Sequence, residues 1–227
     1  MTFPNAANGV KKLFTAEILT IVAIVSVIVT AILAVTTYAA GTVATQSESL
    51  GAAGIALGSL IGMFVTGGAF VVLAIVATIL NLVGLIKATK DDDAFKIALF
   101  STVVSFCLII VGGIFSMNKM AMAYSMTESL GSIASLFVTI YTIQGIRNLA
   151  VKLEDYDMDH KGNNILKVML VVIVLTFIGK LTSAIFFGIG GQIVGGWILI
   201  AAYVLSIIQY LLFLSFLSKA KRMLADK

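Results

Sequence analysis

Long runs of apolar residues alternate with short charged clusters along the chain, and this pattern predicts helices that cross a membrane. A spanning helix needs about 20 predominantly apolar residues. The apolar runs are continuous rather than alternating, so helices would satisfy the backbone hydrogen bonds inside hydrocarbon. The charge-free stretches are 18–47, 49–86, 97–118, 129–146, 168–179 and 181–218. They predict six spans at about 14–38, 66–86, 95–116, 129–150, 164–185 and 196–218.

The composition indicates the same fold class. Hydrophobic residues make up 60% of the 227 residues, charged residues only 11%, and the mean hydropathy is +1.10. A soluble domain carries about 25% charged residues, so a soluble globular enzyme, a disordered chain and a disulfide scaffold are all excluded. The only cysteine is Cys107, in an apolar run. We expect an all-α integral membrane bundle that forms one transmembrane domain over residues 1–227.

The placement of the cations predicts the orientation. With six spans, 13 of the 15 Lys and Arg residues fall on one side, and only Lys119 and Lys180 fall on the other. An excess of Lys and Arg marks the cytoplasmic face. We therefore expect a multi-pass protein of the bacterial plasma membrane with both termini in the cytoplasm. The apolar run 18–40 is longer than the core of a signal peptide, which favours a retained first span.

The six spans read as three consecutive hairpins at about 14–86, 95–150 and 164–218. Each return helix carries one amide side chain before its basic end, namely Asn81, Gln144 and Gln209. A divergent threefold repeat explains this arrangement, and chance similarity among apolar helices explains it as well. If the hairpins surround a pseudo-threefold axis, the three amides would converge.

The two inner connections differ in length and charge. The short link 87–96 contains Asp91, Asp92 and Asp93, which could cap the helix that follows, because carboxylates are favourable at a helix N-terminus. The second link, around 153–164, is longer and acidic, and we expect a solvated loop there. Its alternating Asp155, Asp157 and Asp159 fail the EF-hand pattern, because His160 and Leu166 occupy the glycine and glutamate positions.

Glycines mark the outer segments. Gly54, Gly58 and Gly62 recur every four residues, and Gly191 and Gly195 repeat the same spacing once before the sixth span. Such spacing allows close helix packing within or between chains. One helix over 51–87 would be about 55 Å long at 1.5 Å per residue, so we expect a break at Gly67–Gly68. The segment 41–65 would then be interfacial or re-entrant, and a re-entrant segment would line a pore.

Two features suggest a polar path through the bundle. Lys180 lies within the fifth predicted span, where an ionisable side chain indicates function unless it snorkels to the interface. Tyr141, Gln144 and Asn148 share one face of the fourth span. That face predicts either hydrogen bonding between helices or a route for a solute. Asn81 and Gln209 complete the candidate polar path if the three hairpins converge.

No motif indicates an enzyme or a cofactor. The chain has no phosphate-binding glycine loop, no paired intramembrane carboxylates and no Ser/His/Asp set. Four outer methionines, Met117, Met120, Met122 and Met126, could ligate Cu(I) through their thioethers, but no cysteine or histidine accompanies them. Methionine is also a flexible packing residue, and we assign no metal site.

Two segments resemble recurring pieces of uncharacterised small six-helix membrane proteins of Gram-positive bacteria. They are 9–19 (GVKKLFTAEIL) and 85–96 (LIKATKDDDAFK). The resemblance implies the fold but no activity. The sequence leaves two functions open: a small transporter or channel subunit, or a non-transporting adaptor, accessory, sensory or immunity subunit. The expected partners are the lipid bilayer and a second copy or another membrane protein, with no role for nucleic acid.

Overall fold

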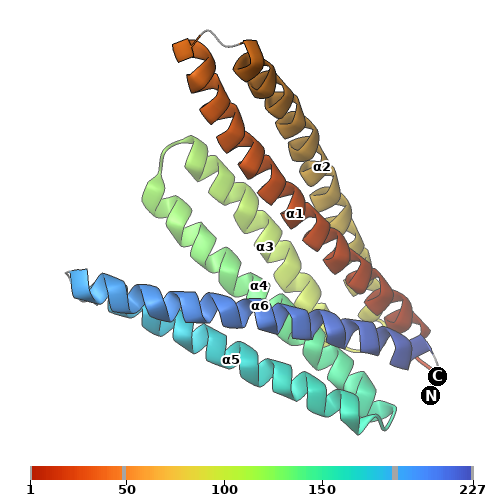
Figure 1. The fold of residues 1–227 in the computed structure, drawn as a ribbon. Coiled ribbons are helices and arrows are strands. Elements are labelled where there is room, and N and C mark those ends of the chain that lie inside the picture. The colour runs from red at the N-terminus through yellow and green to blue at the C-terminus, as the bar shows by residue number, and fades with distance from the viewer. Residues whose placement is uncertain (1, 48–49, 186–188, 226–227) are drawn as a thin grey trace. The chain divides into compact units, whose positions relative to one another are not determined.

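The computed structural model describes residues 2–47, 50–185 and 189–225, and in this part of the chain the secondary structure consists of α-helices joined by short turns (Figure 1). Within that part of the chain, six helices are long and apolar enough to cross a membrane. They are α1 (Pro4–Ser47), α2 (Leu50–Ala88), α3 (Ala94–Met117), α4 (Ala121–Lys152), α5 (Tyr156–Ile185) and α6 (Ile189–Ala225). The predicted fold class, an all-α protein with six candidate spans, is confirmed.

The tight turns after α3 and α4 have the same backbone geometry. After α4, the amides of Glu154 and Asp155 donate to the carbonyls of Val151 and Ala150 at 3.0 and 2.8 Å. This pattern of a 5→2 and a 6→1 bond is the Schellman motif. Its left-handed position is held by Glu154, with φ of 59°. Lys119 takes the same position after α3, with φ of 56°.

The N-terminus of α5 corrects one prediction. The segment 156–164, expected in a long solvated loop, is helical, and the turn after α4 is short. Asp155 caps the new helix, because its Oδ1 accepts a hydrogen bond from the Met158 amide at 3.1 Å. Asp157 and Asp159 lie in the first turn, where carboxylates interact favourably with the helix dipole.

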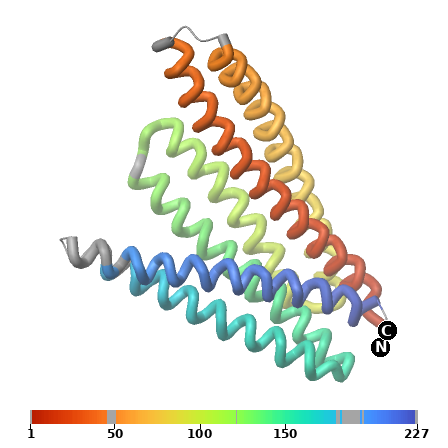
Figure 2. The backbone as a smooth tube through the Cα atoms, viewed as in Figure 1, coloured from red at the N-terminus to blue at the C-terminus, as the bar shows by residue number. Residues whose placement is uncertain are grey.

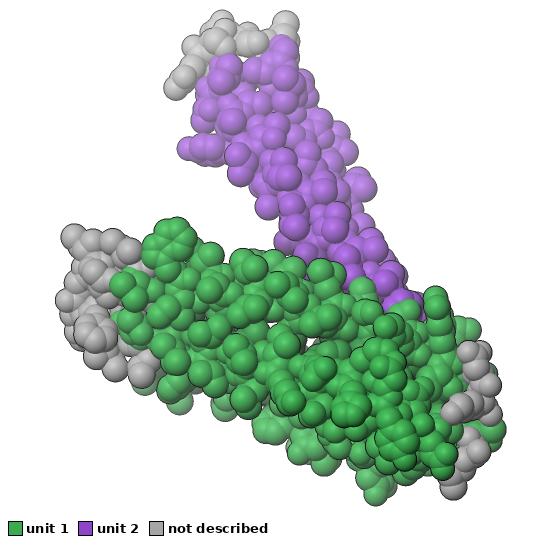
Figure 3. All heavy atoms as spheres, turned by 60° about the horizontal axis from the view of Figure 1, so that its bottom comes forward, with its two compact units in different colours: residues 1–11, 84–227 green, residues 12–83 purple. Residues whose placement is uncertain are grey.

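The chain divides into two compact units, coloured separately in Figure 3. Unit 2 comprises residues 12–83, most of α1 and α2. Its two helices are joined by hydroxyl pairs, Thr30 with Thr66 and Thr37 with Ser59, each 2.7 Å apart. The predicted break at Gly67–Gly68 is wrong, because α2 is one continuous helix (Figure 2). In a chain that crosses hydrocarbon, a continuous helix keeps every backbone group bonded within the segment, and α1, with 44 residues, is longer than α2, with 39.

Unit 1 comprises residues 1–11 and 84–227, and in it α3 pairs with α4, α5 with α6, and α4 with α5. Its buried side chains gather at one end of the helices, which we call the basal end: residues 3–11, 84–98, 143–160 and 213–225. The fully buried large side chains of unit 1 belong mainly to this end: Val10, Leu85, Phe95, Ile143, Ile146, Leu149 and Leu217. The core therefore lies where the charged connections are.

Two glycines allow the helices to approach closely in the basal core. A Cβ added to Gly9 would lie 2.5 Å from the backbone oxygen of Gly84, and one added to Gly145 would lie 2.7 Å from the ring of Phe95. Both distances are too short for any side chain. Away from the basal end, large apolar side chains such as Phe100 and Tyr203 are about 70% exposed, as residues facing lipid would be.

Candidate functional site

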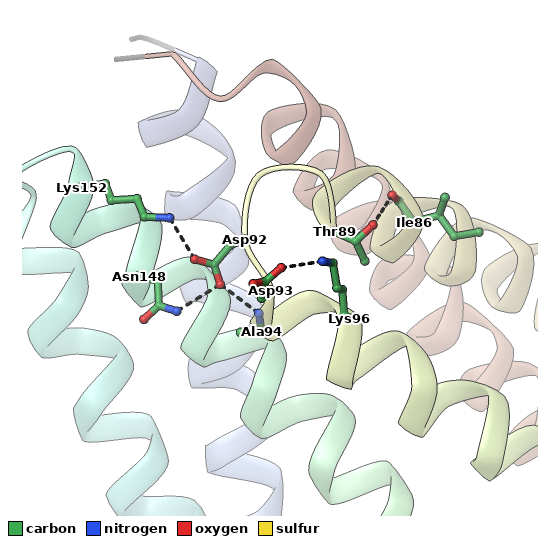
Figure 4. A network of polar contacts seen from close by, with 8 residues as sticks. All are labelled: Ile86, Thr89, Asp92, Asp93, Ala94, Lys96, Asn148 and Lys152. Carbon is green, nitrogen blue, oxygen red and sulfur yellow. Dashed lines mark hydrogen bonds and ion pairs between the residues drawn. The ribbon is translucent and has the colours of Figure 1, made fainter.

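A buried carboxylate, Asp92, is the centre of a polar network at the basal end (Figure 4). Its side chain is only 7% exposed. Oδ1 accepts hydrogen bonds from Asn148 Nδ2 and from the amide of Ala94, both at 3.0 Å. Oδ2 accepts one from Lys152 Nζ at 3.1 Å. One side chain in the turn between α2 and α3 thus holds the start of α3 against the end of α4.

Local sequence explains this geometry. Asn148 and Lys152 are four residues apart on α4, so both side chains lie on the same helix face. Asp92 precedes α3 by two residues, where its carboxylate reaches a first-turn amide and the positive end of the helix dipole. A carboxylate buried to this extent requires such partners, and the network supplies one cation and two neutral donors.

The network continues along α4 into α5. Gln144 Nε2 donates to Asn148 Oδ1 at 3.0 Å, and Arg147 Nη1 donates to Gln144 Oε1 at 3.3 Å. Arg147 Nε donates to Asp159 Oδ1 at 2.7 Å, and both side chains of this ion pair are about three-quarters buried. The amides of Gln144 and Asn148 therefore form part of a continuous chain of bonds from Asp92 to Asp159.

Asp91 connects the same end to the beginning of the chain. Its Oδ2 accepts a hydrogen bond from the Ala6 amide at 2.6 Å, and its Oδ1 accepts one from Asn5 Nδ2 at 3.3 Å. Pro4 is the first residue of α1, so Asp91 caps the first turn of that helix from a distant part of the sequence. The three aspartates do not all cap the helix that follows them, because Asp91 caps α1 and, of the three side chains, only that of Asp92 accepts a hydrogen bond from a backbone amide at the start of α3.

Asp93 differs from its two neighbours because its side chain is 88% exposed and pairs only with Lys96, at 2.7 Å. The hydrogen bond from Lys96 and the charge of that lysine hold the pKa of Asp93 below its ordinary value. Three consecutive aspartates thus have three separate environments, and only Asp92 is enclosed.

The residues predicted to form a polar path do not share one environment. Gln144 and Asn148 are in the network, whereas Tyr141 stacks on Phe137 with ring centroids 6.1 Å apart. Both rings line an apolar groove of about 510 Å³ between α3 and α4. Gln209 is half-buried in α6. The side chain of Lys180 lies outside the described residues.

Asn81, in unit 2, is the remaining member of the predicted path. Its Oδ1 is buried, and no described residue donates a hydrogen bond to it.

The glycines predicted to pack helices are in two kinds of surroundings. A Cβ at Gly62 would lie 3.0 Å from Leu33, so this glycine faces α1. For Gly54 and Gly58, no described atom lies within 4 Å of such a Cβ. What surrounds Gly191 and Gly195 lies outside the described part of the chain.

Sequence reasoning missed the residue on which the network is centred. It identified the face that carries Gln144 and Asn148, and it treated Asp92 only as a capping residue. The sequence did contain a signal for this contact. The acidic link 91–93 lies between two membrane spans on the same side as the basic end of the fourth span, so a bond between the two could have been predicted.

Among the described residues, no group of three or more His, Cys, Asp or Glu side chains could hold a metal ion. Met117, Met120, Met122 and Met126 lie around the turn between α3 and α4, and their side chains are exposed.

The arrangement is a set of ion pairs and hydrogen bonds that fixes helix ends, and together with six long apolar helices it fits a polytopic membrane protein. No family model matches the chain, and no similar curated protein or solved structure was found.

Proposed function

We propose that this protein resides in a bacterial plasma membrane with its basal end in the cytoplasm. Support comes from the cations, because Lys90, Lys96, Lys152 and Lys219 are exposed at the basal end while Lys119 is in the turn between α3 and α4. The positive-inside rule then orients the chain. We also propose that the protein is related to the small six-helix membrane proteins of Gram-positive bacteria that two of its segments resemble. These two segments contact each other, at Gly9 and Ala88.

Cysteine labelling tests the orientation. On a Cys107→Ser background, Lys90→Cys and Lys119→Cys variants are treated in intact cells with a membrane-impermeant maleimide. The Lys119→Cys variant should label directly, and the Lys90→Cys variant only after lysis. The opposite pattern would show that the basal end faces outward.

Within that membrane, the function that the geometry supports best is a non-transporting adaptor or accessory subunit that acts through helix–helix contacts. The observation that carries this proposal is the bonding of Gln144 and Asn148. Their polar groups are engaged with each other, with Arg147 and with Asp92, so they stabilise a fixed basal end. Six long helices then present exposed apolar side chains to lipid or to another membrane protein.

Site-specific photocrosslinking tests the adaptor function. A photoreactive residue is placed at Tyr203, whose side chain is 71% exposed on α6, and at Phe100, which is 70% exposed on α3. Ile146, fully buried on α4, is the matched control position. We expect a discrete protein adduct from at least one exposed position and none from Ile146. An adduct at twice the chain mass would identify a second copy as the partner, and lipid adducts alone from both positions would contradict the proposal.

One observation favours transport as a second candidate. The buried Oδ1 of Asn81 lacks a described donor, and a buried acceptor of this kind costs free energy unless water or a solute bonds to it. In proteoliposomes loaded with pH-sensitive and potassium-sensitive dyes, a transporter would give flux above empty liposomes, and Asn81→Leu would reduce it. An adaptor would give wild-type flux at the empty-liposome baseline.

A further inference from the structure

A groove between α5 and α6 at the basal end combines cations with apolar walls. It has a volume of about 260 Å³ and is lined by Lys161, Ile165 and Val168 of α5 and by Leu212, Phe216 and Lys219 of α6. The floor is well packed, because Ile165 is 5% and Phe216 2% exposed.

On both walls of the groove, the lining changes from a lysine to apolar side chains at the same distance along the helix. α5 and α6 are consecutive helices of one hairpin and run in opposite directions. Seven residues separate Lys161 from Val168, and seven separate Leu212 from Lys219, which is about 10 Å along each helix. Both lysines therefore lie at the basal mouth of the groove, and the apolar side chains continue from there toward the middle of the helices.

The mouth has the charge and the donors for an anionic phosphate group. Lys161 forms an ion pair with Asp157, and Lys219 adds a second cation on the facing helix. Asp157 is 74% exposed, so it neutralises part of the charge without occupying the groove. Asn164 and Ser215 also line the groove and supply an amide and a hydroxyl donor.

The groove between α3 and α4 shows what distinguishes this site. It is larger, at about 510 Å³, and its lining contains no Lys or Arg among the residues that the structure describes. It suits acyl chains but has no group to hold a charged head. Of these two grooves, the one between α5 and α6 joins a cationic mouth to apolar walls within one helix pair.

We propose that the groove between α5 and α6 binds one anionic glycerophospholipid. Its headgroup phosphate contacts Lys161 and Lys219, and one acyl chain lies along Val168 and Leu212. Basic pockets between transmembrane helices are suited to anionic lipid headgroups, and lysine stems can cover the apolar wall while the ammonium groups reach the phosphate. The site goes beyond the adaptor function and depends only on membrane insertion.

Native mass spectrometry of the full-length protein in detergent tests this site. The protein is titrated with dioleoyl phosphatidylglycerol and, separately, with dioleoyl phosphatidylcholine. A lysine near an anionic lipid surface contributes about fivefold in affinity. The Lys161→Gln/Lys219→Gln variant should therefore bind phosphatidylglycerol about 5-fold to about 25-fold more weakly, with little change for phosphatidylcholine.

Lys90→Gln/Lys96→Gln is the matched control, because it removes the same charge from the same end without touching the groove. This control should keep phosphatidylglycerol binding within about twofold of wild type. Equal losses in the two double variants would show general attraction to a basic surface and would overturn the proposal.

Two further arms separate a lipid from free phosphate. Leu212→Ser should weaken the binding of dioleoyl phosphatidylglycerol and leave the binding of the short-chain dihexanoyl lipid unchanged, because only the long acyl chain reaches that wall. Inorganic phosphate in large excess should not displace the dioleoyl lipid. Displacement by phosphate, or no effect of Leu212→Ser on either lipid, would overturn the assignment to a membrane lipid.

Discussion

The residue that most depends on its surroundings is Asp92. Its carboxylate is enclosed and accepts three hydrogen bonds from Ala94, Asn148 and Lys152. In Asp92→Asn, an NH₂ group replaces one of the two carboxylate oxygens. This new donor would then face another donor, either that of Asn148 or that of Lys152. Hydrogen bonds to charged groups contribute about 1.5–3 kcal/mol each, so Asp92→Asn should lower the free energy of unfolding by about that amount. Steric trapping or thermal unfolding in detergent measures it.

Asp93→Asn is the matched control for this prediction. It makes the same chemical change one residue away, at an exposed side chain whose only described partner is Lys96. We expect no measurable shift in the unfolding midpoint. If the two variants behave alike, the enclosure of Asp92 contributes nothing to stability.

Glu154 carries backbone strain that a single substitution can remove. With φ of 59°, it occupies a region that costs an L-residue about 1–2 kcal/mol and that glycine adopts freely. Glu154→Gly should therefore raise the free energy of unfolding by about 1 kcal/mol. Glu154→Ala removes the same charge but keeps the Cβ, so it should give no gain. A gain from both would assign the effect to charge rather than to backbone strain.

At the scale of helices, α1 and α2 cross closely at Gly9. A Cβ there would meet the backbone oxygen of Gly84 at 2.5 Å and Ala88 at 3.0 Å, and neither backbone can yield without separating the helices. Gly9→Ala should cost about 1–3 kcal/mol, as overpacking does. Gly41→Ala, on the same helix with no described atom within 4 Å of the new Cβ, gains the same helix propensity without the clash. It should be neutral or stabilising in the same unfolding assay.

The helices were predictable from sequence because a continuous apolar run of this length satisfies its backbone hydrogen bonds in hydrocarbon by forming a helix. Their ends were less predictable. Gly67 and Gly68 suggested a break, yet glycine only weakens a helix, and α2 continues through both because no alternative pairing would satisfy the backbone. The polar face of α4 was also predictable from spacing. The bond from Asn148 to Asp92 was not, since 56 residues separate them and spacing reports only local neighbours.

At the scale of the whole molecule, the chain concentrates its core at the basal end of unit 1 and leaves other apolar surfaces exposed. For a soluble protein this distribution would be unfavourable. In a bilayer, lipid tails solvate apolar side chains as well as other side chains do, so stability comes from packing and polar bonds rather than from removing apolar surface from water. The basal end supplies both, through Ile146 and its neighbours and through the network around Asp92.

This distribution predicts that equal truncations on one helix have unequal costs. Ile146 is fully buried in the basal core, whereas Ile133, on the same helix, is 50% exposed. Ile146→Ala leaves a cavity that packed neighbours cannot fill and should cost about 2–4 kcal/mol. Ile133→Ala leaves a gap that lipid or detergent can occupy, so the loss should be much smaller. Unfolding both variants in the same lipid–detergent mixture gives the comparison, and equal losses would mean that the core extends along the whole helix rather than being concentrated at its charged end.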